Sequence, residues 1–326
     1  MTIEIKTSTI QPVRNTFAHI ERRFGDKPAS RYQEASYDLA PTTNFHYRPL
    51  WDPERRLNDP GRTAITMEDW YAFRDPRQYY YGSYVQARAK LQEITESNYA
   101  FFTRRDLASR LPEAAREKVV RCLLPLRHLE MGANMNNVFG SAYGIGTVLT
   151  QAFLYNGMDR LGIAQYLSRI GLILDGNSGD TLKAAKTHWM EDPLWQDLRR
   201  YVEDVLAQKD WFEVFVAQDV VLDTLVYDIF YRQFDEAMTG AGAGDLAMLI
   251  EFMQEWHKET SRWVDTVLKT AAAESDANRE QIAAWVADWK QQALAALGPL
   301  AEEAVGPDAI NASAEVLNKR LAKAGL

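Results

Sequence analysis

Apolar side chains recur every three or four residues between positions 113 and 140, which is the period of a buried α-helix. Polar side chains lie within this stretch at Glu130, Asn134 and Asn137, and their spacings of four and three place them on one face. A polar column along a core helix costs free energy unless each group finds a partner. The stretch therefore predicts either a polar network at a helix contact or a metal site.

The same period predicts helices along most of the chain, and no stretch shows the clear alternation of a half-buried strand. The segment 210–238 is apolar on several faces, which is typical of a helix at the centre of a large bundle. A charged stretch at 273–279 indicates a linker. The predicted helices are 76–104, 113–140, 146–172, 181–190, 193–208, 210–238, one capped by Asp245 that carries Gln254 and His257, one that carries Trp285 and Trp289, and 308–323.

Residues 1–65 predict an irregular arm, because prolines spread from Pro12 to Pro60 prevent long helices. The arm is rich in aromatic residues, unlike a disordered tail, so we expect it to be ordered. It either folds back on its own bundle or lies over a partner chain. We favour the partner, because aromatic residues are enriched in interfaces. The candidate interface anchors are Tyr37, Phe45, Tyr47 and Trp51.

Two histidines stand in an incomplete metal-binding pattern. Helical bundles that hold two irons use Glu-x-x-His pairs, in which both ligands project from one helix face. Here Pro125 stands three residues before His128, and Gln254 stands three residues before His257. Neither proline nor a neutral amide supplies the required carboxylate. The pattern indicates a di-iron bundle that has lost its ligands, so we predict no metal site, no cofactor site and no catalytic residue in this chain.

The sequence resembles the β subunit of the hydroxylase component of bacterial multicomponent monooxygenases, and is most similar to that of the phenol hydroxylases. The resemblance rests on residues 16–39, 69–88 and 124–137 and extends over nearly the whole chain. It implies an all-α, ferritin-like helical bundle with an extended irregular N-terminal arm. We expect the arm at 1–65 to contact partner subunits, the ferritin-like core to span 66–272, and the C-terminal helices at 273–326 to pack on that core.

The resemblance also implies a function and a set of partners. The chain would be a non-catalytic structural subunit of an (αβγ)2 complex that uses O2 to hydroxylate phenol or a related aromatic. Its partners would be the hydroxylase α and γ subunits and a second αβγ protomer. The α subunit would hold the di-iron centre, a reductase would hold FAD and a 2Fe-2S cluster, and a small regulatory protein would act on the complex. The family's two single-glutamate ligands would fall roughly at Glu96 and at Gln218 or Asp219.

Charge and composition exclude several other functions. The net charge of −8, without a concentrated basic patch, argues against nucleic-acid binding. The single cysteine, Cys122, allows no intrachain disulfide and suits a reducing cytoplasm. No run of apolar residues is long enough to cross a membrane, and the N-terminus lacks the apolar core of a signal peptide. We therefore expect a cytoplasmic protein.

Two alternatives remain open at this point. One is an unrelated helical scaffold protein, in which the incomplete motifs are coincidental. The other is a self-contained di-iron or di-manganese oxidase, although its histidines would lack the usual carboxylate three residues earlier. Its candidate ligands would be Glu96, His128, Glu130, Asp219, Glu255 and His257.

Overall fold

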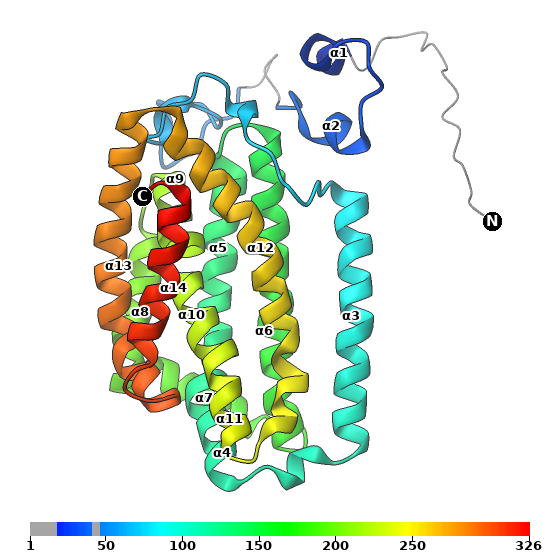
Figure 1. Ribbon diagram of the computed structural model, residues 1–326, viewed down its shortest axis with the longest axis vertical. Helices are drawn as coiled ribbons and strands as arrows, with labels where there is room; N and C mark the ends of the chain where they lie inside the picture. The colour runs from blue at the N-terminus through cyan, green and yellow to red at the C-terminus, as the bar shows by residue number, and fades with distance from the viewer. Residues whose placement is uncertain (1–17, 41–45) are drawn as a thin grey trace, which may run out of the picture.

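A computed structural model describes residues 18–40 and 46–326, and these ranges are mostly helical, with no strand (Figure 1). The prediction of an all-α fold is confirmed. No helix in the described ranges has both the length and the apolar character needed to cross a membrane. The helices are α1 (Ala18–Phe24), α2 (Arg31–Ser36), α3 (Tyr81–Arg104), α4 (Glu113–Lys118), α5 (Leu126–Tyr143), α6 (Thr147–Leu174), α7 (Asp180–Glu191), α8 (Pro193–Leu206), α9 (Trp211–Phe215), α10 (Asp223–Tyr227), α11 (Phe234–Gly240), α12 (Ala247–Glu274), α13 (Asp276–Ala304) and α14 (Ala309–Ala324).

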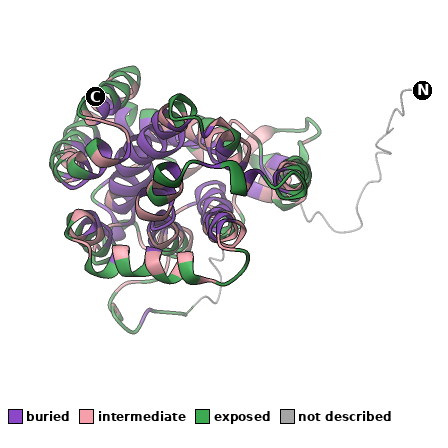
Figure 2. Cartoon of the chain, turned by 90° about the horizontal axis from the view of Figure 1, so that it is seen from below, coloured by how far each residue is buried: buried purple, intermediate pink, exposed green. Residues whose placement is uncertain are grey.

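The core lies between α5, α6, the run from α9 to α11, and α12. Helices α5 and α6 pack along each other, while α13 packs on α8 and α12, and α14 covers α10 and α13. Helix α3 stands on the opposite side of the bundle and packs on α12 (Figure 1). Buried residues gather in the middle of this arrangement, with exposed residues on its outer helices (Figure 2).

The run from α9 to α11 is the central element, as its apolar sequence predicts. Two π-helical segments, Val216–Leu222 and Asp228–Gln233, connect its three α-helical parts, so the backbone stays helical from Trp211 to Gly240. Every residue of Val216–Leu222 is buried. A third π segment, Val119–Leu123, joins α4 to the turn formed by Leu124 and Pro125 before α5. Because π turns are often found at functional sites, the side chains of these segments are candidate functional residues.

The described part of the N-terminal arm folds onto its own chain. Ile20, Tyr32 and Tyr37 are buried, and the Tyr32 hydroxyl accepts a hydrogen bond from the Asp75 N–H at 2.7 Å. Tyr37 packs edge-on against the rings of Phe24 and Tyr32. Tyr37 therefore packs mainly within its own chain and leaves little surface for a partner, and its role as an interface anchor stays a prediction.

The other anchor candidates differ in exposure. Tyr47 is exposed, and Trp51 is partly exposed while its indole N–H donates to the Tyr143 hydroxyl at 2.9 Å. Phe45 lies outside the described residues. The exposed surface among the described anchor candidates therefore lies mainly at Tyr47 and the outer face of Trp51.

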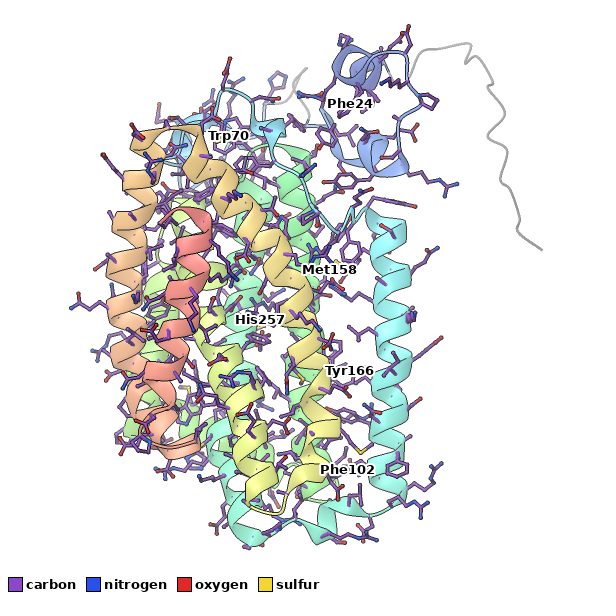
Figure 3. The ribbon with its side chains drawn as sticks, in the orientation of Figure 1. Phe24, Trp70, Phe102, Met158, Tyr166 and His257 are labelled. Atoms are coloured by element: carbon purple, nitrogen blue, oxygen red, sulfur yellow. The ribbon has the colours of Figure 1, made fainter. Side chains whose placement is uncertain are left out.

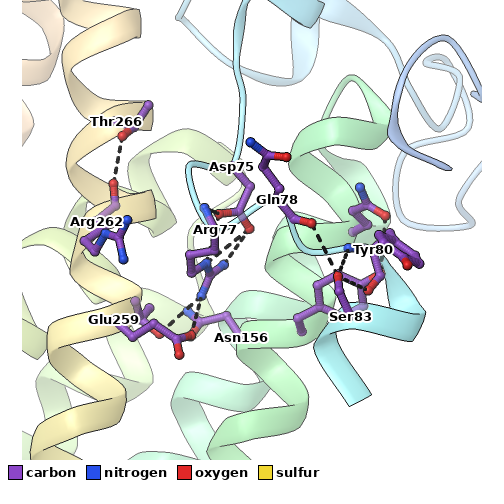
Figure 4. Close-up of polar contacts among 12 residues, drawn as sticks. Asp75, Arg77, Gln78, Tyr80, Ser83, Asn156, Glu259, Arg262 and Thr266 are labelled. Atoms are coloured by element: carbon purple, nitrogen blue, oxygen red, sulfur yellow. Dashed lines mark hydrogen bonds and ion pairs between the residues drawn. The ribbon is translucent and has the colours of Figure 1, made fainter. Parts of the chain in front are cut away.

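Helix α3 begins at Tyr81 rather than at the predicted residue 76. The Asp75 carboxylate does not cap a helix, because it accepts hydrogen bonds from the Arg77 backbone N–H and guanidinium at 2.8–3.2 Å. Gln78 then adopts a left-handed conformation, with φ of 55°, that ends any helical path. Arg77 also pairs with Glu259 of α12 at 3.7 Å, so this turn anchors the start of α3 to the bundle (Figure 4).

The predicted linker at 273–279 is also wrong. Only Ser275, in an extended conformation, separates α12 from α13, and its hydroxyl accepts a hydrogen bond from the Asn278 N–H at 3.1 Å. Charged residues made this stretch look like a linker, although serine followed by Asp276 is a good helix start. Asp245 lies within a 3-10 turn, Gly244–Leu246, and does not cap α12 through its side chain.

Candidate functional site

The bundle core contains a charged cluster centred on Arg160, a fully buried residue of α6. Its Nη1 atom donates to Glu130 Oε2 of α5 at 3.1 Å. Its Nη2 atom donates to Asp219 Oδ1 at 3.4 Å and also to Asp223 Oδ2. All three carboxylates are buried, so one cation stands among three acidic groups. We call Arg160, Glu130, Asp219 and Asp223 the Arg160 cluster.

Buried amide side chains hold the carboxylates of this cluster in place. Asn137 Nδ2 and Asn156 Nδ2 both donate to Asp219 Oδ1, at 3.1 and 2.8 Å. Gln218 Nε2 donates to Asp223 Oδ1 at 2.9 Å. The three amides are themselves fully buried, so their orientations are fixed by these partners and not by water.

Aromatic side chains from α10 and α12 complete the surroundings of the cation. The Tyr227 hydroxyl donates to Glu130 Oε1 at 2.8 Å. The guanidinium carbon of Arg160 lies 4.5 Å from the ring centroid of Trp256 and 5.6 Å from that of Tyr227. Such ring faces attract a cation. Helices α5, α6, α10 and α12 therefore each contribute at least one side chain around the guanidinium.

Helix geometry explains why these residues meet. Asn156 and Arg160 are four residues apart on α6, so they share one face, as do Glu130 and Asn137 on α5. In the π segment Val216–Leu222 the turn is wider, and the Asp223 N–H donates to the carbonyl of Gln218, five residues earlier. Asp219 within the segment and Asp223 after it both face Arg160.

The charges of the cluster are unequal. Burial raises the pKa of Glu130 to about 7, although Arg160 draws it down. Burial, followed by the neighbouring Asp223 carboxylate, raises the pKa of Asp219 to about 7. Burial opposes the charge on Arg160, but the surrounding carboxylates, with Asp223 first, raise its pKa overall. The guanidinium therefore stays charged, whereas two of its acidic neighbours exchange protons near neutral pH.

The two histidines of the incomplete motifs do not meet. His128 is half-buried on α5 and stacks on Trp189 of α7, with ring centroids 5.8 Å apart. His257, midway along the bundle in Figure 3, stacks on Tyr227 with centroids 4.7 Å apart. Burial lowers the pKa of His128 to about 4 and that of His257 well below its ordinary value, so both rings are neutral. Only His257 borders the Arg160 cluster, through Tyr227.

The remaining candidate ligands are also dispersed. Glu96 on α3 pairs with Arg169 at 2.7 Å, and the exposed Glu255 pairs with Lys258 at 3.3 Å. Gln254 donates to the Tyr231 carbonyl at 2.7 Å. Pro125 is buried at the start of α5. Of the six ligands proposed for a self-contained oxidase, only Glu130 and Asp219 face the same group.

Comparisons with known proteins place the chain in a family. Residues 51–275 match the family described as methane/phenol/alkene hydroxylase. The chain belongs to this family. It is 55% identical to the phenol 2-monooxygenase oxygenase component DmpL of Pseudomonas sp. (strain CF600), over 100% of this chain and 98% of that protein.

Two further similarities extend this placement. A solved structure of xenon-pressurised phenol hydroxylase from Pseudomonas sp. OX1 matches with a TM-score of 0.94 and 50% identity, over 99% of this chain and 98% of the solved chain. The β subunit of the toluene-4-monooxygenase hydroxylase component of Ectopseudomonas mendocina is 22% identical, over 79% of this chain and 77% of that subunit. The predicted family resemblance is confirmed, and with it the ferritin-like fold.

The residues of this hydroxylase-family chain do not fit a di-iron centre. A carboxylate-bridged di-iron site takes a single glutamate from each of two helices and a Glu-x-x-His pair from each of two others. Here the side chains turned to the centre include a cation, Arg160 on α6, and an indole, Trp256 on α12, and neither group is a ligand for iron. Within residues 18–40 and 46–326 no three or more His, Cys, Asp or Glu side chains are grouped to hold a metal ion.

Sequence reasoning found part of this site and missed its centre. Glu130 and Asn137 do form a buried polar column, but Asn134 is only half-buried and donates to the Gly157 carbonyl at 2.8 Å. Arg160 and its neighbour Asn156 were not singled out. The sequence signal for these two residues was their spacing, because Asn156 and Arg160 are polar and lie four positions apart within the apolar stretch that forms α6.

Proposed function

We propose that this chain is the non-catalytic β subunit of the hydroxylase component of an aromatic monooxygenase, acting on phenol or a related aromatic. The observation that carries the proposal is Arg160, whose guanidinium occupies the centre of the bundle among the carboxylates. A cation fixed in that position leaves these carboxylates unavailable to metal ions. The names of the relatives support the assignment, since one is a phenol 2-monooxygenase oxygenase component and another a hydroxylase β subunit.

The proposal includes the partners that such a subunit needs. The catalytic di-iron centre would lie in an α subunit, within an (αβγ)2 assembly in the cytoplasm. Electrons would come from a reductase with FAD and a 2Fe-2S cluster, and a small regulatory protein would bind the assembly. The contribution of this chain is structural, because it presents a rigid helical surface on which the catalytic subunit and the second protomer are held.

An exposed apolar face supports the need for partners. Three side chains on α5 and three on the adjacent α6 are each 41–48% exposed, and they recur at helical spacing. The two rows adjoin, because Val138 lies against Gly157 where the helices pack closely. Contiguous exposed apolar patches mark interaction sites more often than free surface. We call this set the α5–α6 face, which consists of Met131, Met135, Val138, Leu154, Met158 and Leu161.

The test is to co-express the chain with the other hydroxylase subunits and to introduce lysine into the α5–α6 face. We expect Met135→Lys with Met158→Lys to reduce co-purification and phenol hydroxylation, because a lysine charge at an apolar interface is costly. The thermal midpoint of this chain should change little, since both positions are exposed. Val316→Lys, at an exposed apolar site on α14, is the matched control and should have no effect.

Metal analysis of the separated subunits completes the test. The iron should remain with the partner subunit, and this chain should carry less than one metal ion. About two irons retained by this chain after separation would contradict the proposal and favour a self-contained oxidase. Normal assembly and turnover of the double lysine variant would show that the α5–α6 face is not the docking surface.

A further inference from the structure

The surroundings of Arg160 form a complete recognition site for a planar cation. Its two terminal nitrogens donate to three different carboxylates, and Nη1 also donates to the Tyr227 hydroxyl at 3.2 Å. The Trp256 ring covers the guanidinium at 4.5 Å. We propose that the bundle core is a binding site for a guanidinium-type cation, and that Arg160 is the ligand which the chain supplies to itself in place of a metal.

The chemistry of the site favours an organic cation over a metal ion. The carboxylates lie around the edge of a flat group, each reached by an N–H, which matches the fork geometry of guanidinium. An aromatic face attracts a weakly hydrated planar cation, but it provides no oxygen or nitrogen ligand for a metal. The described residues also contain no group of side chains placed to hold a metal ion.

A second observation points to the same ligand. Asn156 is fully buried, and its Nδ2 atom is committed to Asn137 Oδ1 at 2.7 Å and to Asp219 Oδ1 at 2.8 Å. Its Oδ1 atom has no partner among the described residues, and neither has Arg160 Nε. The site thus offers an acceptor that the tethered guanidinium does not use. A free guanidinium ion carries one N–H donor more than the arginine side chain does.

The charge balance of the site determines the stability of the core. Without the cation, Glu130, Asp219 and Asp223 would be buried acids with no positive partner, which is a severely destabilising arrangement. A guanidinium supplied by the chain makes the core independent of any metal supply. This deepens the proposed function, because it explains how a subunit of an iron-dependent family keeps a carboxylate-lined core without iron. Its test measures stability, so it can fail while the subunit assignment stands.

The experiment is chemical rescue of Arg160→Ala, in the full chain with whatever subunits purify with it. We expect the thermal midpoint to fall by about 10 °C relative to the wild type. Millimolar guanidinium or methylguanidinium should restore part of that loss, whereas equal NaCl or urea should not. Urea is the decisive control, because it has nearly the shape of guanidinium and no charge. The wild type should gain nothing, and Arg160→Ala with Asp219→Asn should respond less.

Each outcome decides the proposal. If Arg160→Ala does not fold alone, the soluble fraction after refolding in guanidinium or in urea replaces the midpoint, and a higher fraction in guanidinium supports the site. Equal effects of guanidinium, urea and NaCl would overturn it. An unchanged midpoint in Arg160→Ala would also overturn it, as would rescue by Mn²⁺ and not by guanidinium, which would indicate a metal-type site.

Discussion

At the scale of single residues, the protein concentrates more acid than base at its most buried point. Burying an ion pair costs free energy that its own attraction often fails to recover. The Arg160 cluster offsets part of this cost with amide donors and the Tyr227 hydroxyl. It also raises the pKa values of Glu130 and Asp219, so that protons reduce the excess negative charge. Such an arrangement makes stability depend on pH.

The first prediction follows from these two pKa values. Both rise to about 7 in the folded chain from ordinary values of 4.5 for Glu130 and 3.8 for Asp219. Between those limits the folded state binds protons that the unfolded state has released, so stability falls as pH rises and levels off above pH 7. Burial also lowers the pKa values of His128 and His257, which acts in the opposite sense between pH 5 and pH 7 because their unfolded rings bind protons there. We therefore expect the effect of the two acids, roughly 2 kcal/mol for each group from pH 5 to pH 8, to appear as a difference between the wild type and a variant that lacks one of them, measured by unfolding in urea.

Asp219→Asn isolates the contribution of the cluster, because it removes one of the two titrating groups. The free energy of unfolding at pH 5 minus that at pH 8 should be smaller for this variant than for the wild type. Carboxyl groups whose pKa is lowered, such as Glu96 beside Arg169, lose their stabilising effect only at lower pH and do not mask this window. Equal differences in variant and wild type would show that Asp219 does not titrate there.

The second prediction separates two asparagines on α5. Asn137 is fully buried and donates to Asp219 Oδ1 at 3.1 Å, whereas Asn134 is half-buried and donates to a helical carbonyl. Asn137→Leu should lower the free energy of unfolding by about 1–3 kcal/mol, because Asp219 and Asn156 lose a buried partner. Asn134→Leu should cost about 1 kcal/mol or less. Urea titrations measure both, and equal losses would contradict the ranking.

At the scale of elements, α6 is the helix on which the core depends. It carries the Arg160 cluster on one side, part of the α5–α6 face on another, and packs its C-terminal end against α7. That last contact is close at Gly171. A methyl group there would lie 2.6 Å from Leu182, 3.0 Å from the Thr181 hydroxyl and 3.1 Å from Leu124. Two of these neighbours belong to α7 and the third precedes α5, so the added methyl group is confined from two sides.

The third prediction compares two glycines of α6. Gly171→Ala should lower the free energy of unfolding by about 1–3 kcal/mol, because it overpacks the contact with α7. Gly162→Ala, two and a half turns earlier, meets nothing within 4 Å and should stabilise the helix by about 0.5–1 kcal/mol. Thermal and urea unfolding measure both. A loss at Gly162 as large as that at Gly171 would show that packing is not the cause.

The spacing of hydrophobic residues was sufficient to predict the long helices, but it did not predict the features that form the site. The predicted helices 146–172 and 193–208 correspond closely to α6 and α8. The π segment that carries Asp219 has no sequence signature in that period, because a wider turn leaves the apolar character of the helix unchanged. Arg160 was missed for a related reason, because the role of a charged residue in an apolar stretch depends on partners that only the packing reveals.

At the scale of the whole molecule, the described part of the arm makes more contacts with the bundle than the sequence indicated. Arg23 pairs with Asp38 and with Asp69 at 2.6 Å, and the Thr147 hydroxyl of α6 donates to the Ser36 carbonyl at 2.6 Å. Prolines and aromatic residues do not specify which surface such an arm covers. The division into an arm, a core and C-terminal helices stays a prediction.

The last prediction concerns the part of the arm that remains open to a partner. Leu50 is 99% exposed and Tyr47 is 57% exposed, whereas Tyr37 is buried within the chain. Apolar side chains this exposed contribute nothing to the fold of the chain alone, but they can anchor an interface. Tyr47→Ser with Leu50→Ser should therefore leave the circular dichroism melt unchanged and weaken assembly with the other hydroxylase subunits, as measured by sedimentation of the co-expressed complex.

Tyr37→Ala is the matched control and should behave in the opposite way. It removes a buried ring that packs on Phe24 and Tyr32, so it should lower the melting midpoint. Its effect on assembly should follow from that loss of stability and should diminish at low temperature, where the fold is intact. The Tyr47 and Leu50 variant should keep its assembly defect at every temperature below the melt. If instead it assembles as the wild type does, the arm serves only its own bundle, and the partner surface is confined to the helices.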